Sequence, residues 1–448
     1  MEAKIKNIVN ENSKEMIESL KSAVRINSVM DEKTATETMP FGKGVDDALR
    51  KTLEIAESLG FKTVYKDGYY GYAEVGEGEE LIGILGHIDV VPVGDESKWK
   101  FPPFSATEED GYIYGRGTQD DKGPTIAAMY AVKSLLDAGV TFGKRVRFII
   151  GGDEENLWRC ISKYTEDGEE IPSMGFTPDS SFPVTNAEKS LVQFYLRGKG
   201  TKNLNLAISG ALNAVPGEAN YTGELADKLS DKLDELKFEY KKEENQVTVI
   251  GKRVHAASAD KGINAIERLC KALYEIGVKD DVVRFVAELS DSVGSKILPN
   301  CIDDVSGILT LNLGELIINE NESILGYDSR IPVKYTIENL EDAVKEKASG
   351  YDLEFEEFDR LKSLYVPADS DLIKTLVSVY EQETGLEGTP LSSGGATYAK
   401  ALDNCVAFGA MFPFDEKTEH QENERINIKN LIKATEIYAL AVYRLLCL

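Results

Sequence analysis

Histidine, cysteine and positive charge are all scarce in this chain of 448 residues. It contains 3 histidines, and its 51 lysines and arginines are outnumbered by 77 acidic residues, which gives a formal charge of -26. A surface of that sign repels the phosphates of nucleic acids and of anionic membranes. We therefore expect no nucleic-acid partner and no membrane partner.

Disulfide frameworks and membrane segments are not indicated either. The five cysteines are scattered and include no CxxC pair, so neither a set of disulfides nor a thiolate zinc site is expected. No apolar run approaches the length of a membrane span, and the first thirty residues lack the apolar core of a signal peptide. These absences predict a cytoplasmic protein with reduced thiols.

Strand and helix patterns alternate in the first part of the chain. The apolar runs ELIGILGHID and KRVRFIIGG have the character of strands, and a helical pattern at residues 125–139 separates them. This order predicts an α/β fold, a mostly parallel sheet with helices on both faces. The chain is also too long for one ordinary core.

From about Lys189 the pattern changes to alternating strands such as SLVQFYLRG and NQVTVIG. Between these two strands, the charged stretch at residues 227–245 is typical of a solvated amphipathic helix. The α/β pattern returns near residue 371. We therefore predict a domain in two parts, residues 1–188 and 369–448, and an inserted α+β domain at residues 189–368. The insertion, called the lid below, is long enough for two subdomains.

Polar residues stand where two of the predicted strands end, which is where ligand sites form in α/β sheets. His87 and Asp89 lie two residues apart, so on a strand their side chains share a face, and a carboxylate often holds the second nitrogen of a histidine ligand. The three successive acids from Asp153 would repel one another unless cations bind nearby. We expect chemistry at these two strand ends.

Three further acidic or histidine residues extend this set. Asp120 lies in GRGTQDDKGP at the mouth of a helix, Asp179 follows a proline, and His420 lies in TEHQENE. Taken alone, each has an ordinary explanation as an acidic helix cap, a solvated turn or a structural histidine. Together the set offers one histidine per metal, two single carboxylates and a shared one, which is enough for two divalent ions.

Eight motifs occur in order between Gly86 and Glu424: GHIDVVP, GRGTQDDKGP, GGDEEN, GFTPDSSFP, NAVPGEA, VHAASADKGINA, SSGGATYAKAL and EHQENE. With these motifs the chain resembles the peptidase V-type dipeptidases of the zinc aminoacylase and carboxypeptidase family, which includes carnosinase and succinyl-diaminopimelate desuccinylase. The resemblance implies a dipeptidase that acts on a small peptide with two divalent metal ions. Zinc is the first expectation, with manganese or cobalt as alternatives.

The resemblance also implies the metal ligands. Asp120 would bridge the two ions, His87 and Asp179 would complete one coordination sphere, and Glu155 and His420 would complete the other. A cis peptide bond between Asp120 and Asp121 is implied as well.

Catalytic and substrate-binding roles follow from the same resemblance. Glu154 would be the general base, Asp89 the partner of His87, and His255 the oxyanion donor contributed by the lid. The residues implied to contact the substrate are Asn213, Arg330 and Gly395. Among them, the arginine suits a bidentate grip on a carboxylate.

Two departures from the family pattern concern the substrate. Asn156 and Leu157 replace the Ser-Gly of the usual Asp-Glu-Glu-Ser-Gly-Trp, and Ala187 replaces the glycine of Asn-Gly-Glu-Lys at the lid hinge. An N-acyl amino acid deacylase or desuccinylase using the same site is therefore an alternative. A non-catalytic binding protein that keeps the fold is another, although the retained Glu154 argues against it.

The length of the insertion bears on the oligomeric state. In this family a doubled lid takes the place of the partner subunit that shorter relatives recruit. The resemblance therefore implies a monomer, in which His255 acts on the active site of its own chain.

Overall fold

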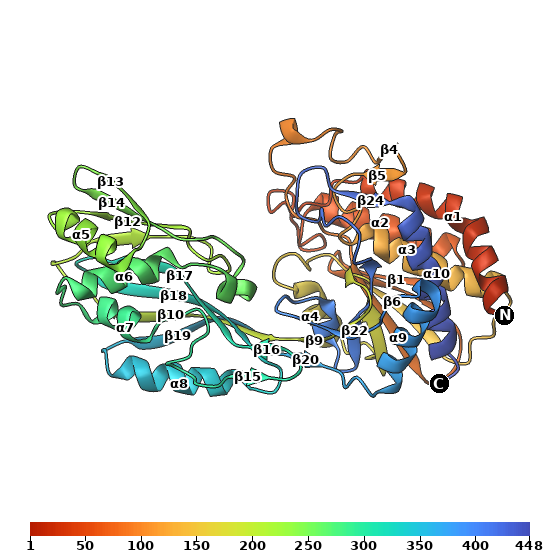
Figure 1. The fold of residues 1–448 in the computed structure, drawn as a ribbon. Coiled ribbons are helices and arrows are strands. Elements are labelled where there is room, and N and C mark those ends of the chain that lie inside the picture. Colours follow the sequence, from red (N-terminus) through yellow and green to blue (C-terminus); the bar gives the residue numbers. More distant parts are fainter. The chain divides into compact units, whose positions relative to one another are not determined.

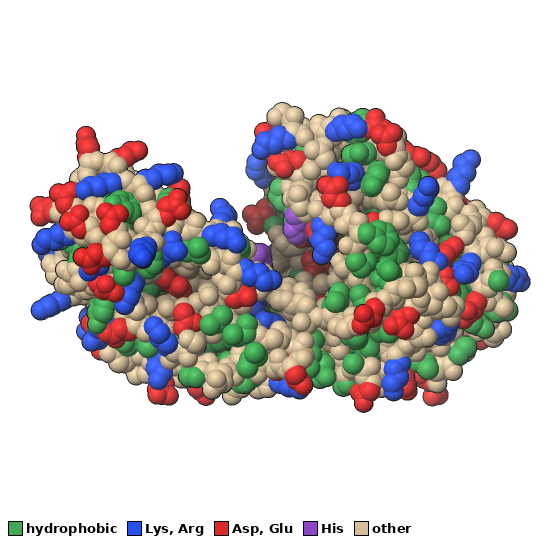
Figure 2. Space-filling view, in the orientation of Figure 1, with side chains coloured by type: hydrophobic (Ala, Val, Ile, Leu, Met, Phe, Trp, Pro, Cys, Tyr) green, Lys and Arg blue, Asp and Glu red, His purple; other side chains and the backbone are tan.

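The computed structural model describes all 448 residues, and they divide into two compact units. Unit 1 contains residues 1–186, 366–391 and 396–448, and unit 2 contains residues 187–365 and 392–395. Figure 1 shows the elements of each unit. Acidic and basic side chains are interspersed over the face seen in Figure 2.

Unit 1 is built on a mixed sheet with the strand order β1-β2-β6-β3-β7-β22-β9-β20, in which β21 also pairs with β9. The central strands are parallel to one another; they are β6 (Arg145–Gly151), β3 (Leu81–His87), β7 (Met174–Thr177) and β22 (Cys405–Ala407). The outer strands are β1 (Lys62–Lys66), β2 (Tyr70–Val75), β9 (Thr185–Glu188), β20 (Leu364–Tyr365) and β21 (Leu391–Ser393).

The outer pairings β1-β2, β2-β6, β22-β9 and β9-β20 are antiparallel, so the sheet is less parallel than the sequence predicted. The tight turn between β1 and β2 explains part of this difference. Asp67 and Gly68 both have positive φ there, and such a short connection joins only antiparallel neighbours. The predicted α/β class is confirmed, with a mixed sheet.

The helices of unit 1 are α1 (Glu2–Val24), α2 (Lys43–Ser58), α3 (Lys122–Asp137), α4 (Arg159–Glu166), α9 (Asp371–Thr384) and α10 (Ile428–Leu445). Of these, α2, α3 and α4 contact strands of the main sheet. α3 is buried along most of its length because it packs on β3 and also contacts α1 and α10. A helix in that position is apolar nearly all round, which is the pattern of residues 125–139. None of the helices is both long and apolar enough to cross a membrane.

Short strands in unit 1 join segments that are far apart in the sequence. β24 (Arg425–Asn427) pairs with β5 (Tyr112–Tyr114), which also pairs with β4 (Thr107–Glu109). β23 (Ala410–Met411) pairs with β8 (Ser180–Ser181). As a result, the loops before α3, after β7 and before β24 are held in one region.

Unit 2 contains a five-stranded antiparallel sheet with the order β11-β17-β18-β10-β19 and a three-stranded sheet with the order β12-β14-β13. Its strands are β10 (Ser190–Lys199), β11 (Leu206–Ile208), β12 (Glu218–Thr222), β13 (Tyr240–Glu243), β14 (Gln246–Ile250), β15 (Ile302–Asp303), β16 (Gly307–Ile308), β17 (Thr310–Ile318), β18 (Glu322–Ile331) and β19 (Glu354–Leu361). Its helices are α5 (Ala226–Leu236), α6 (Ala265–Glu275), α7 (Asp281–Leu289) and α8 (Ile337–Ser349).

The two strands predicted in this region, SLVQFYLRG and NQVTVIG, are confirmed as β10 and β14. The helix predicted through residue 245 is wrong in its second half. The left-handed conformation of Lys237 ends α5 after Leu236, and β13 then pairs with β14 across a turn at Glu244. Pairing with β14 satisfies the backbone hydrogen-bonding groups of β13. The pattern of charges alone does not distinguish this strand from a helix.

Candidate metal centre

Six of the predicted site residues converge in unit 1. His87 is the last residue of β3, Glu154 and Glu155 follow β6, and Asp179 follows β7. β3 is parallel to both β6 and β7, so the carboxyl ends of these strands lie at one edge of the sheet. Asp120 and His420 reach this edge from the loops before α3 and before β24.

The carboxylate of Asp120 contacts both histidines. Its Oδ1 lies 2.9 Å from His87 Nε2, and its Oδ2 lies 2.8 Å from His420 Nε2. Asp179 Oδ2 lies 3.6 Å from the same His87 nitrogen, and Glu155 Oε2 lies 3.2 Å from the same His420 nitrogen. Two histidine–carboxylate groups therefore share Asp120. The peptide bond that follows it, to Asp121, is cis, as the resemblance implies.

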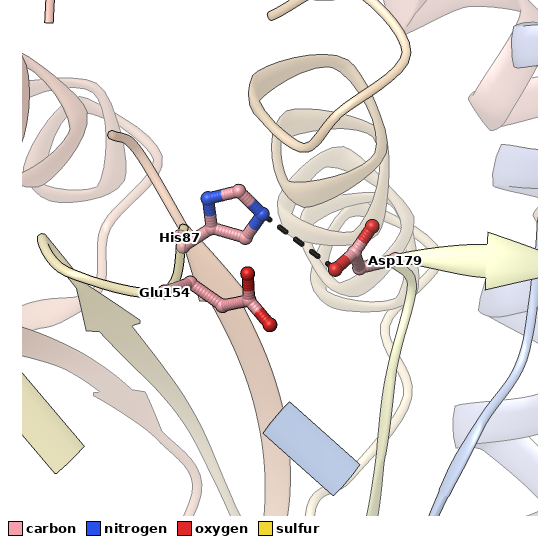
Figure 3. Close-up of side chains that lie close together, drawn as sticks. All are labelled: His87, Glu154 and Asp179. Carbon is pink, nitrogen blue, oxygen red and sulfur yellow. Dashed lines mark ion pairs between the residues drawn. The ribbon is translucent and has the colours of Figure 1, made fainter. Parts of the chain in front are cut away.

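The donor atoms fit divalent cations. Ligand atoms of His87, Glu154 and Asp179 lie within 4.8 Å of one another, and so do those of His87, Asp120 and Glu155. Figure 3 shows the first group, with Asp179 facing the imidazole. His87 Nε2, Asp120 Oδ1 and Glu155 Oε1 are buried without a hydrogen-bond partner, which is unusual for polar atoms inside a protein. Nitrogen and carboxylate oxygen are the ligands that zinc and related ions take.

The electrostatics also favour positive charge at this centre. Burial raises the pKa of Glu154 well above its usual range and that of Glu155 to about 7. Hydrogen bonds to Asp120 and Glu155 raise the pKa of His420 to about 11. Burial works against ionisation of Asp120, but the nearby imidazoles of His420 and His87 favour its negative charge and lower its pKa. Positive charge is therefore favoured at this centre, and a divalent cation would supply it.

Asp89 holds the two glutamates in position. Its Oδ1 accepts a hydrogen bond from the backbone N–H of Glu154 and its Oδ2 accepts one from that of Glu155, both at 3.1 Å. His87 Nδ1 lies 3.1 Å from the backbone oxygen of Asp89 and 3.5 Å from its carboxylate. The resemblance implies that the Asp89 side chain is the partner of His87. In the structure the backbone oxygen of Asp89 is nearer to the ring than its carboxylate is.

The turn after the glutamates closes without the family's glycine. Leu157 stands at the glycine position and does not have a positive φ; the left-handed residue is Trp158, at φ 57°. The Trp158 N–H donates to the backbone oxygen of Asp153, and the Asp153 carboxylate accepts hydrogen bonds from Arg159. An L-residue thus fits at position 157 without backbone strain.

A cleft of about 340 Å³ opens at this centre, at the small end of the range of roughly 300–1,000 Å³ for small-molecule sites. Gln119 and Glu419 line it together with four of the predicted ligands, Asp120, Glu155, Asp179 and His420. Gln119 Oε1 accepts hydrogen bonds from the backbone N–H groups of Thr418 and Glu419, at 2.9 and 3.1 Å. The sequence analysis missed both lining residues, although each lies beside a predicted ligand in a motif already identified.

The remaining predicted residues gather within unit 2. The backbone oxygen of Asn213 accepts a hydrogen bond from Ala256 N–H at 2.8 Å, next to His255. Arg330 Nη1 donates to the backbone oxygen of Gly394 at 2.8 Å, next to Gly395. The guanidinium is buried, and Asp328 holds it through contacts of 2.8 Å to Nε and 3.0 Å to Nη2.

His255 is held as a neutral hydrogen-bond donor. Its Nδ1 accepts a hydrogen bond from the backbone N–H of Ala257 at 3.1 Å, which leaves the ring proton on Nε2. Burial lowers the pKa of His255, and the positive charge of Arg330 lowers it further.

Comparisons with known proteins identify the family. The model of Peptidase family M20/M25/M40 matches residues 83–444. The chain belongs to this family. This peptidase is 39% identical to "Putative dipeptidase YtjP" of Bacillus subtilis (strain 168), over 96% of its own length and 97% of the relative's. The predicted resemblance is therefore confirmed, and the chain is a hydrolase of a metal-binding family whose members generally hold two divalent metals.

Solved structures share the fold of this peptidase. A metallo-carboxypeptidase of the M20 family from Sulfolobus solfataricus superimposes with a TM-score of 0.59 at 20% identity, covering 97% of this chain and 100% of the other. Human carnosine dipeptidase 1 superimposes with a TM-score of 0.60 at 16% identity, covering 100% and 99%. At these identities the similarity concerns the fold alone.

Proposed function

We propose that this peptidase hydrolyses dipeptides with two divalent metal ions held by His87, Asp120, Glu155, Asp179 and His420. The observation that carries this proposal is the carboxylate of Asp120, which presents one oxygen to His87 and the other to His420. A carboxylate shared between two histidine–carboxylate groups suits the bridging ligand of a two-metal site. The name of the Bacillus subtilis relative supports a dipeptide as the substrate.

The bound ions would polarise the scissile carbonyl and lower the pKa of a water molecule. Glu154 takes a proton from that water and returns it to the leaving amine. Glu154 lies among the predicted ligands, within 4.8 Å of the ligand atoms of His87 and Asp179, so it can reach a water bound at the same place. Asp89 keeps it there by holding its backbone N–H.

Residues of unit 2 take the other roles in this proposal. The Nε2 proton of His255 would stabilise the oxyanion of the transition state. Arg330, Asn213 and Gly395 would bind the carboxylate end of the substrate. His255→Ala should therefore reduce kcat while the metal content of the protein stays at the wild-type level. Zinc is the proposed native ion, with manganese and cobalt as the ions to compare.

A substrate panel tests the proposal. The protein is stripped with a chelator, reloaded with zinc, manganese or cobalt, and assayed against dipeptides, tripeptides and N-acyl amino acids, with Glu154→Ala as the inactive control. Metal-dependent release of amino acids from dipeptides is the expected result. Turnover of N-acyl amino acids alone would indicate a deacylase, and no turnover with any ion would indicate a non-catalytic binding protein.

We also propose that the enzyme is a cytoplasmic monomer. Mixing inactive His255→Ala chains with inactive Glu154→Ala chains tests the monomer. The mixture stays inactive if each chain uses its own histidine, and it regains activity if subunits share histidines across an interface.

A further inference from the structure

Glu419 has a carboxylate oxygen with no partner in the cleft of unit 1. Its Oε2 is buried and forms no hydrogen bond, although the residue lines the same cleft as Asp120 and His420. Lys417 also lines this cleft and influences Glu419 through its charge, without a hydrogen bond between the two side chains. A buried carboxylate oxygen is costly unless a donor reaches it. The oxygen is therefore an acceptor for a donor that enters the cleft.

The position of Glu419 is fixed relative to the metal residues. Its backbone N–H donates to Gln119 Oε1 at 3.1 Å, and Gln119 immediately precedes Asp120. Gln119 Nε2 donates to the backbone oxygens of Glu416 and Arg425, at 2.9 and 2.7 Å, so the same side chain holds both ends of the segment that carries Glu419. The carboxylate is thus set beside the reaction centre by contacts independent of its own side chain.

The five residues proposed above to hold the two metal ions, His87, Asp120, Glu155, Asp179 and His420, do not include Glu419. Its carboxylate is therefore open to a donor on the substrate. In a dipeptide, the α-ammonium is a cation present whatever the side chains, and only the α-carbon separates it from the scissile carbonyl. An N-acyl amino acid has no charged group at that position.

We propose that Glu419 binds the free α-ammonium of the substrate and so makes the site selective for unblocked dipeptides over N-acyl amino acids. This inference rests on the dipeptidase function proposed above. A hydrogen bond between ammonium and carboxylate is charge-assisted and stronger than a neutral one. A neutral acyl group in the same place leaves the carboxylate buried and unpaired, which disfavours the N-blocked substrate.

The test compares two substrates that differ only in the amine, Ala-Ala and N-propionyl-alanine, by the rate of alanine release. The wild type should strongly prefer Ala-Ala. Glu419→Gln should lower kcat/KM for Ala-Ala by roughly 10- to 100-fold and leave that for N-propionyl-alanine nearly unchanged, because only the first substrate loses a charged partner. Glu419→Asp, which keeps the charge on a shorter side chain, should retain an intermediate preference.

Glu422→Gln is the matched control, because Glu422 lies on the same segment with a partly exposed side chain that pairs with Lys98. Its preference between the substrates should equal that of the wild type. If the wild type cleaves Ala-Ala and Glu419→Gln prefers it over N-propionyl-alanine to the same degree, the role given to Glu419 is overturned and the proposed dipeptidase function is not. Loss of metal from Glu419→Gln would also overturn this role, by making Glu419 a metal-positioning residue. A wild type inactive on dipeptides would instead refute the proposed function.

Discussion

The carboxylate of Glu424 and the guanidinium of Arg116 form a buried ion pair, with Oε2 and Nη1 2.6 Å apart. The other oxygen of Glu424 accepts hydrogen bonds from the backbone N–H groups of Gly117 and Gln119, at 3.0 and 2.9 Å. It also lies 3.3 Å from the N–H of Asp120. Glu424, from the last part of the chain, thus holds the loop before α3 that carries Asp120.

Replacing Glu424 with alanine should therefore destabilise the protein strongly. Arg116 is only 2% exposed and would lose its partner, and breaking a buried pair in this way costs about 3–5 kcal/mol. Urea unfolding measures the loss. Glu422→Ala, two residues away and partly exposed, should stay within about 0.5 kcal/mol of the wild type. Equal stability of the two variants would contradict the structural role given to Glu424.

The adjacent glutamates should behave differently when each is replaced with alanine. Glu154→Ala should keep its metal and lose turnover by roughly 10²- to 10⁴-fold, because it removes the general base. Glu155→Ala should lose metal affinity first, because Glu155 lies 3.2 Å from His420 in the shared centre. Elemental analysis after gel filtration and kcat at saturating metal separate the two effects. Equal metal loss in both variants would mean that their roles are exchanged or shared.

Asp89→Asn should weaken metal binding and turnover together. In the wild type, the Asp89 carboxylate accepts hydrogen bonds from two backbone N–H groups. The substitution keeps the shape of the side chain but places an amide N–H₂, which is also a donor, opposite one of them. Changes in groups that orient metal ligands typically cost 10- to 100-fold, and we expect about this effect on metal affinity. Metal titration measures it. Asp95→Asn, at an exposed turn where asparagine serves equally well, is the control.

Much of the candidate centre could be predicted from the sequence because its ligands follow apolar strands. His87 ends β3 and Glu154 follows β6, and the polar residues after parallel neighbours meet at one edge. The pairing of Arg116 with Glu424 could not be predicted in this way, since it depends on β24 lying beside β5. Glu419 was missed for a related reason: its sequence context does not reveal that its carboxylate oxygen is buried without a partner.

Strand pairing between segments was also not predictable from the sequence. This applies to the antiparallel edges of the main sheet and to the second half of the stretch at residues 227–245. Periodicity and charge describe a segment by itself, whereas β13 is a strand because β14 offers it a partner. The family resemblance implies which residues are ligands. The fold then showed that one carboxylate contacts both histidines, which spacing along the chain could not reveal.

Removing the metals should lower the thermal stability of the protein. The carboxylates of Asp120, Glu155 and Asp179 lie around two histidines in a partly buried cluster, and bound cations would relieve the repulsion among them. Binding at a free metal concentration 100 times Kd stabilises the folded state by about 2.7 kcal/mol, which corresponds to roughly 5–10 °C for a unit of this size.

Differential scanning calorimetry of chelated and reloaded protein measures this shift in Tm, which should grow from about pH 6 to about pH 8 because the ligands must be deprotonated to bind. Asp179→Asn removes a charged ligand, so its shift should be smaller than that of the wild type. His255→Ala lies in unit 2 and should keep the full shift. Cations that bind only the folded cluster must stabilise the folded protein. A Tm that neither chelator nor added metal changes, in the wild type and in Asp179→Asn alike, would therefore refute the metal assignment.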